Sequence, residues 1–84
     1  MNLGEMILNI NNKNDLVRFM GILRDDLRNN SDTWTNINLN DYLEAMQSWI
    51  EDIEGWEKTC KIDVSKISHW QLVAHILLAS KMYE

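Results

Sequence analysis

The sequence predicts an all-α fold, a compact bundle of three main helices preceded by an irregular N-terminal arm. Apolar residues recur every three or four positions in three separate stretches, and polar capping residues stand at the start of each stretch. The chain also contains no proline that would break these helices. With 84 residues, 45% of them hydrophobic and 25% charged, residues 1–84 fit one small globular domain.

The first helix is predicted over residues 15–28, with Asn14 as its N-cap. Its apolar positions are Leu16, Phe19, Met20, Leu23 and Leu27, at helical spacing. The polar residues 29–38 follow as a loop. Trp34 and Ile37 are the apolar members of this loop, and we expect both to fold back onto the core.

The second helix is predicted over residues 39–54, with Asn38 as its N-cap and Gly55 as its stop signal. Asp41 stands three residues after Asn38, as in a capping box with a shorter acid. One face of this helix is apolar: Leu39, Tyr42, Leu43, Met46, Trp49, Ile50 and Ile53. The pattern predicts an amphipathic helix packed on the core.

The third helix is predicted over residues 69–82. Ser68 and Gln71 fit a capping box at its start, and Ile67 with Leu72 fits a hydrophobic staple. Its apolar arc is unusually wide and comprises Trp70, Leu72, Val73, Ala74, Ile76, Leu77 and Ala79. A helix with so wide an arc is expected at the centre of the bundle.

Two short apolar segments, residues 5–10 and 60–64, lack helical spacing. An irregular conformation and a short two-stranded ribbon between them are both compatible with their sequences. A lone ribbon of two strands needs helices to cover it.

Residues 39–57 carry the charge imbalance of the chain, because this stretch has a net charge of −6 and the whole chain has −5. This stretch has no Lys or Arg and contains six acidic residues: Asp41, Glu44, Glu51, Asp52, Glu54 and Glu57. Acidic character disfavours nucleic acids and anionic membranes, which attract Lys and Arg. It favours a basic protein partner instead.

Tyr42, Trp49 and Trp56 are spaced seven residues apart, so they form one aromatic ladder if the helix continues past Gly55. The functional interpretation is a partner-binding strip in which these rings are anchors and the neighbouring Asp41 and Asp52 attract a basic surface. In the alternative interpretation the rings pack against the other helices and the acids only face water.

No constellation for catalysis, metal binding or cofactor binding is evident. His69 and His75 are six residues apart, which is not a metal-ligand spacing, and no third group would orient either beside Cys60. Cys60 is the only cysteine, so a reducing cytoplasm is the simplest expected location. Residues 1–8 make a poor signal peptide, and no apolar run approaches the roughly 18 residues of a membrane span.

Three short motifs follow one another in a specific order along the chain. They are Trp34-x-Asn36, then Leu39-x-x-Tyr42-Leu43-Glu44-Ala45-Met46-x-x-Trp49, and finally Ala74-x-x-Leu77-Leu78-Ala79-x-Lys81-x-Tyr83-Glu84. Over residues 14–84 this order resembles a family of small acidic uncharacterised bacterial domains. The family usually continues after Gly55 with two aromatics and a proline-containing loop, which this chain lacks. The resemblance implies the fold and no particular activity.

These observations lead to a non-enzymatic protein-binding domain as the expected function. The leading form is an immunity or antitoxin-like inhibitor, whose acidic aromatic helix would cover the basic surface of a toxin such as a nuclease. The alternative is an adaptor or regulatory module unrelated to toxins. A small enzyme and a self-associating structural protein are further alternatives, and the oligomeric state stays open.

Overall fold

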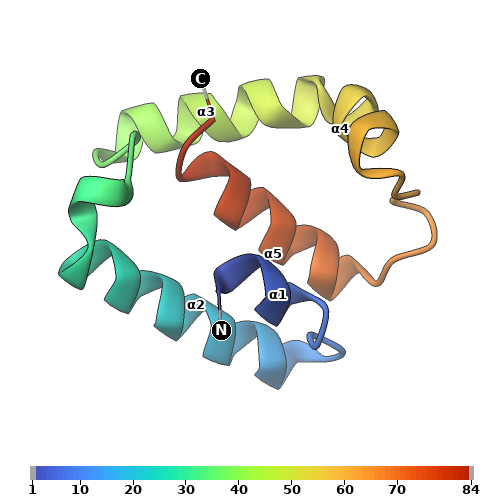
Figure 1. Ribbon diagram of the computed structural model, residues 1–84, viewed down its shortest axis with the longest axis horizontal. Coiled ribbons are helices and arrows are strands. Elements are labelled where there is room, and N and C mark those ends of the chain that lie inside the picture. The colour runs from blue at the N-terminus through green and yellow to red at the C-terminus, as the bar shows by residue number, and fades with distance from the viewer. Residues whose placement is uncertain (1, 84) are drawn as a thin grey trace.

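The computed structural model describes residues 2–83, which form α-helices and one short 3-10 turn without any strand (Figure 1). The elements are α1 (Leu3–Ile7), α2 (Lys13–Asn29), η1 (Ser31–Thr33), α3 (Leu39–Glu51), α4 (Ile53–Cys60) and α5 (His69–Ser80). The all-α prediction is therefore confirmed. The three predicted helices correspond to α2, α3 and α5, whereas α1 and α4 are additional.

Local capping residues set where the long helices begin. The N-caps predicted at Asn38 and Ser68 are confirmed, because each side chain accepts a hydrogen bond from the backbone N–H three residues later, at 2.8 and 3.2 Å. The N-cap predicted at Asn14 is wrong. Asn12 caps α2 instead, since its side chain accepts from the N–H of Asp15 at 2.9 Å, and the helix begins two residues earlier than expected.

The expected stop at Gly55 is wrong, because the chain turns before this residue and resumes as a helix that passes through it. The turn is at Asp52, whose N–H is shared between the carbonyls of Ser48 and Trp49 at 3.1 and 3.2 Å. Helix α4 then ends at Cys60, followed by Lys61 in the left-handed conformation with φ of 56°. No glycine among residues 2–83 has a positive φ.

The two short apolar segments form no ribbon, and only part of them is irregular. Residues 3–7 form α1, capped by Asn2, which accepts from the N–H of Glu5 at 2.8 Å. Ile7 at the end of α1 and Ile10 in the segment after it are both buried, at 1% and 3% exposed. Residues 60–64 form the end of α4 and the turn after it. The prediction of a ribbon is therefore wrong.

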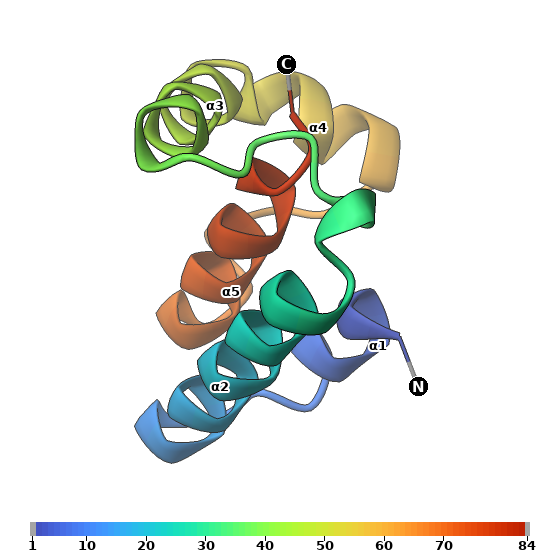
Figure 2. The ribbon, with the colours of Figure 1, turned by 90° about the vertical axis from the view of Figure 1, so that its left-hand side faces the viewer.

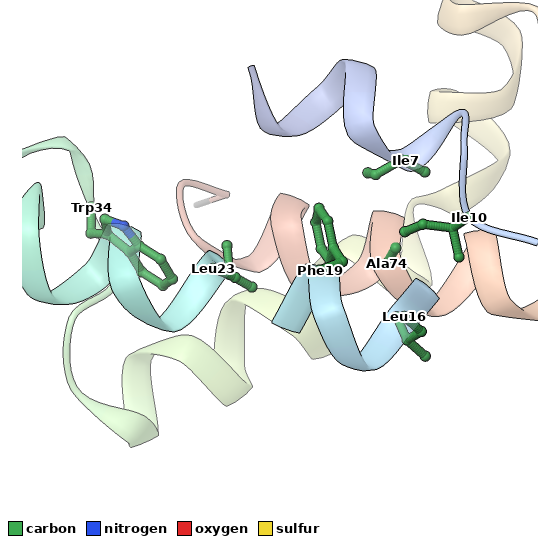
Figure 3. Close-up of a cluster of buried hydrophobic side chains, with 7 residues drawn as sticks. All are labelled: Ile7, Ile10, Leu16, Phe19, Leu23, Trp34 and Ala74. Carbon is green, nitrogen blue, oxygen red and sulfur yellow. The ribbon is translucent and has the colours of Figure 1, made fainter. Parts of the chain in front are cut away.

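Helix α5 lies at the centre of the fold, as its wide apolar arc predicts. It packs against α1, α2 and α3, whereas α2 and α3 lie on opposite sides of it and their backbones do not come close to each other (Figures 1 and 2). The buried core joins α1, α2, α5 and the loop after η1, and comprises Ile7, Ile10, Leu16, Phe19, Leu23, Trp34 and Ala74 (Figure 3). Buried Trp49 of α3 lies outside this cluster.

The loop between η1 and α3 contributes Trp34 to the core, as expected. Its indole is 7% exposed, and its N–H donates to a carboxylate oxygen of Asp26 at 2.9 Å. The ammonium of Lys81 binds the same oxygen at 3.0 Å and lies 5.5 Å from the centre of the Trp34 ring. Trp34 therefore fastens the C-terminal end of α5 to α2.

Ile37 does not fold onto the core, so that part of the prediction is wrong. Its side chain is 59% exposed. The inward position is taken by Asn36, whose side-chain amide donates to the backbone carbonyls of Ser80 and Tyr83 at 3.1 and 2.8 Å.

Candidate functional site

Two rings of the predicted aromatic ladder face the interior. Trp49 is 4% exposed. Tyr42 is half-buried, stacks on Trp34 with ring centres 6.1 Å apart, and donates its hydroxyl proton to the carbonyl of Leu77 at 2.7 Å. Burial raises the pKa of the Tyr42 hydroxyl above its ordinary value. Tyr42 and Trp49 therefore hold α3 against the rest of the fold.

The third ring of the ladder, Trp56, is half-buried on α4. Its ring centre lies 5.1 Å from that of Trp49 and 4.9 Å from that of His75 on α5. Loss of water around the imidazole lowers the pKa of His75 below its ordinary value. Trp56 thus bridges the two helices on either side of it.

Asp41 and Asp52, the acids expected beside the ladder, are exposed and already have hydrogen-bond partners. Asp41 accepts from the side-chain amide of Asn38 at 2.8 Å. Asp52 accepts from the hydroxyl of Tyr83, and this bond raises the pKa of that hydroxyl. Both acids therefore help to shape the ends of α3 and the C-terminal segment.

The remaining acids of α3 and α4 form no ion pair within the described residues. All three ion pairs within residues 2–83 involve acids of α2: Asp15 with Arg18, Asp25 with Arg28, and Asp26 with Lys81. Glu44, Glu51 and Glu54 are exposed. The charges of Glu44 and Glu51 on α3 are therefore not neutralised by an ion pair among residues 2–83.

An apolar stripe runs along α3 beside these acids. Leu39, Leu43 and Ile50 are 71%, 52% and 46% exposed. They lie within about 40° of one another around the helix axis, because a helical residue turns by roughly 100°. Leu43 shares a shallow surface hollow with Glu44 and Glu51. We call these five residues the α3 surface.

The sequence pattern places this stripe on the predicted core face of the helix. The helix has only one large neighbour, α5, so it can bury only the part of its apolar arc that contains Ala45 and Trp49. The apolar arc of this helix is too wide for one neighbouring helix to cover. This width is the feature of the sequence that indicates an exposed apolar surface.

An apolar groove continues the α3 surface toward α2. It has a volume of about 320 Å³. Its apolar lining includes Met20 and Leu27 from α2, Ile37 and Leu39 near the start of α3, Tyr42, and Leu77 from α5. Arg24 is the one charged residue on its edge. The groove lies between α2 and α3 because both helices pack against α5 and their backbones stay apart.

A larger cleft of about 750 Å³ lies between the N-terminal residues, the loop around η1 and the junction of α3 and α4. Trp49, Trp56 and Leu78 line it together with Asp26 and Lys81. The hydrogen bond from Lys81 lowers the pKa of the Asp26 carboxyl below its ordinary value. The polar groups at this cleft are therefore already paired with each other.

Two further features bear on the kind of site this chain can form. Within residues 2–83, no group of three His, Cys, Asp or Glu side chains lies close enough together to hold a metal ion. Over the same residues, no helix has both the length and the apolar character needed to cross a membrane.

The fold and its surfaces define a small all-α domain with an exposed acidic and apolar helix. The chain belongs to a family of unknown function, DUF7660, whose family model matches residues 12–84. The match begins at the N-cap of α2 and includes α3 and α5. No curated protein and no solved structure matches the chain.

Proposed function

We propose that this chain is a non-enzymatic protein-binding domain whose α3 surface binds a basic partner protein. The observation that carries the proposal is the pairing on one helix of exposed apolar side chains, Leu39, Leu43 and Ile50, with acids that no cation neutralises within residues 2–83. Aliphatic anchors beside a charged rim form the usual anatomy of a protein interface.

The two components have different physical roles. Fully burying a Leu or Ile side chain contributes about 1.5–3 kcal/mol relative to leaving it in water, so the stripe supplies affinity. Glu44 and Glu51 attract a basic surface from a distance, which speeds association and favours partners of the correct charge. This second contribution weakens as salt rises.

The proposed anchors are the residues of the apolar stripe and not the neighbouring aromatic rings that the sequence indicates. Tyr42 and Trp49 are engaged in packing α3 against the fold. Asp41 and Asp52 are additional exposed negative charges at the edge of the proposed surface. Trp56 is half-buried and packs against His75, so it is not one of the proposed anchors.

Inhibition of a basic toxin, as in an immunity protein, is the specific form of this proposal. Its support is the uncompensated acidity, because toxins that act on nucleic acids need basic sites. Co-expression with the product of the neighbouring gene tests this form. Rescue of growth supports it, and unimpaired killing leaves only the adaptor or regulatory form.

A photo-crosslinking amino acid tests the general proposal in cells that produce the protein. We expect position 43 or 50 to capture one basic protein. Position 8 on α1 is the matched control, since Leu8 is 71% exposed and lies away from α3. No product at positions 43 and 50, or equal capture at position 8, would contradict the proposal.

Charge reversal then tests the role of the acids with the captured partner. Glu44→Lys with Glu51→Lys should slow association about tenfold or more at low salt, and much less at high salt. Glu5→Lys with Asp32→Lys is the control, because these exposed acids give the same change in net charge outside the α3 surface. Equal slowing by both pairs would show that only net charge matters.

A further inference from the structure

We propose that α4 is a lid that opens as a unit at the edge of the large cleft, and that Trp56 is the side chain that holds it closed. Such a lid acts on the cleft and is independent of the α3 surface. Three features of α4 support it: few attachments to the rest of the fold, a break in the helical backbone at each end, and the place of Trp56 in the cleft wall.

Helix α4 has few attachments to the rest of the fold. It is the only α-helix among residues 2–83 that contains no buried residue, and no residue from 50 to 73 is buried. Its backbone comes close to that of α3 but to that of no other described helix. A segment with so few buried contacts opens at a lower free energy than the core. An isolated helix of eight residues is also unstable in water, so α4 should lose its helical hydrogen bonds when it detaches.

The helical backbone is interrupted at both ends of α4. Asp52 forms the bend after α3, with φ and ψ of −96° and 12°. At the other end Lys61 has a left-handed φ of 56°, which is unfavourable for a residue other than glycine. Residues 61–68 then connect α4 to α5 without any helix (Figure 1). Helix α4 can therefore move while α3 and α5 stay in place.

The Trp56 side chain connects α4 to α5, although the backbones of these two helices stay apart. Its ring centre lies 4.9 Å from that of His75 on α5 and 5.1 Å from that of Trp49 on α3. Packed aromatic rings stabilise a contact beyond the area that they bury. The carboxylate of Glu57, which is also half-buried, binds the N–H of Val64 at 3.0 Å in the turn after the helix. Trp56 is therefore the side chain that we expect to hold the lid closed.

Trp56 is the only residue of α4 that lines the cleft. Asp26 and Lys81 belong to a fixed wall of the cleft, because their ion pair at 3.0 Å joins the end of α5 to α2. Trp49, whose ring packs on that of Trp56, is only 4% exposed while α4 is in place. Movement of α4 therefore removes one wall of the cleft and uncovers the Trp49 ring. Access to this ring from the cleft depends on the position of α4.

Native-state hydrogen exchange in increasing urea tests whether α4 opens by itself. We expect the amides of residues 57–60 to exchange about tenfold or more faster than those of residues 73–78 in α5, with rates that depend little on urea. The α5 rates should rise steeply with urea, because their exchange requires exposure of the whole core. Equal rates with the same urea dependence in both helices would overturn the inference.

A proline in α4 tests whether the rest of the fold can do without this helix. Thr59 is exposed, so Thr59→Pro breaks the helix through its backbone without removing a packed side chain. Thr59→Ala is the matched control. We expect Thr59→Pro to leave the NMR signals of α2 and α5 folded and to raise the hydroxyl-radical oxidation of Trp49 several-fold, while Trp34 stays as protected as in the control. Unfolding of the whole chain, or unchanged oxidation of Trp49, would overturn the inference.

Trp56→Ala tests the role of the ring in the native-state exchange experiment. The variant should speed exchange of the amides of residues 57–60 about tenfold or more, because the ring packing that holds α4 is lost. Lys58→Ala is the control at an exposed position of the same helix and should leave these rates unchanged. Equal rates in Trp56→Ala and Lys58→Ala would refute the assignment of Trp56.

Discussion

Asp26 is the residue at which three parts of the chain meet. Its carboxylate accepts hydrogen bonds from the indole of Trp34, the amide of Asn30 and the ammonium of Lys81. Only 12% of the Lys81 side chain and 19% of the Asp26 side chain are exposed, so this pair is more shielded from water than the two other ion pairs. The motif residues Trp34 and Lys81 thus have a structural role here.

Acid should weaken the protein through Asp26. Because the folded-state pKa of Asp26 lies below the ordinary value of 3.8, the unfolded chain binds more protons, and the stabilisation is lost as pH falls below about 3.8. Asp26→Asn should lower stability at pH 7 and flatten its decline between pH 5 and 3 in urea titrations. Asp25→Asn is the control, because the Asp25 side chain is 64% exposed. Equal effects of both changes would contradict this role.

At the scale of elements, the α3–α4 junction shows how tertiary structure overrides a local signal. A glycine at the end of an amphipathic pattern usually ends the helix. Here the chain bends three residues earlier, at Asp52, and Gly55 lies inside α4 with its N–H bound to the carbonyl of Asp52 at 2.9 Å. The bend directs Trp56 toward His75.

Gly55→Ala tests whether Gly55 is a helix stop or an interior residue of α4. A Cβ atom added at Gly55 would meet nothing within 4 Å, and Gly55 does not have a positive φ. In a helix interior Ala is better than Gly by about 0.5–1 kcal/mol, so the variant should raise the free energy of unfolding by that amount. Urea denaturation measures the change, and destabilisation would restore Gly55 as a helix stop.

Helix α4 depends on side chains for its attachment to α5. Because the folded-state pKa of His75 lies below the ordinary value of 6.5, the unfolded chain binds more protons and stability should fall as pH drops through about 6.5. His75→Gln should flatten this decline between pH 7 and 5, as followed by tryptophan fluorescence in urea. His69→Gln is the exposed control, and an unchanged pH profile in His75→Gln would contradict the assignment.

The three long helices could be predicted because their signals are local. An N-cap such as Asn38 or Ser68 acts on a backbone N–H three residues away, and helical spacing needs no knowledge of neighbours. Helix α1 could not, because five residues carry too little periodicity and form a helix through the burial of Ile7 and Ile10.

The candidate site was predicted only in outline, for a related reason. The acidity of the second helix is visible in the sequence, and so is its wide apolar arc. Which part of the arc stays exposed depends on where α5 lies, and this is a property of packing. Packing of α3 on the rest of the fold buries Trp49 and leaves Leu43 and Ile50 in the exposed stripe.

At the scale of the whole molecule, α5 separates two different environments. On one side α1 covers the core and the larger cleft contains paired polar groups. On the other side the groove is apolar apart from Arg24, and the neighbouring α3 surface combines apolar side chains with unneutralised acids. Ion pairs are concentrated on α2, whereas the acids of α3 have no cation partner among residues 2–83. This asymmetry favours the α3 side for binding.

The affinity of Leu39→Ser with Leu43→Ser for the crosslinked partner tests this account most directly. Both side chains are more than half exposed, at 71% and 52%, so the free energy of unfolding of the variant should stay within about 0.5 kcal/mol of the original. We predict that the dissociation constant rises by a factor of about 100 or more, as loss of two interface anchors implies. An unchanged dissociation constant would contradict the assignment of the α3 surface.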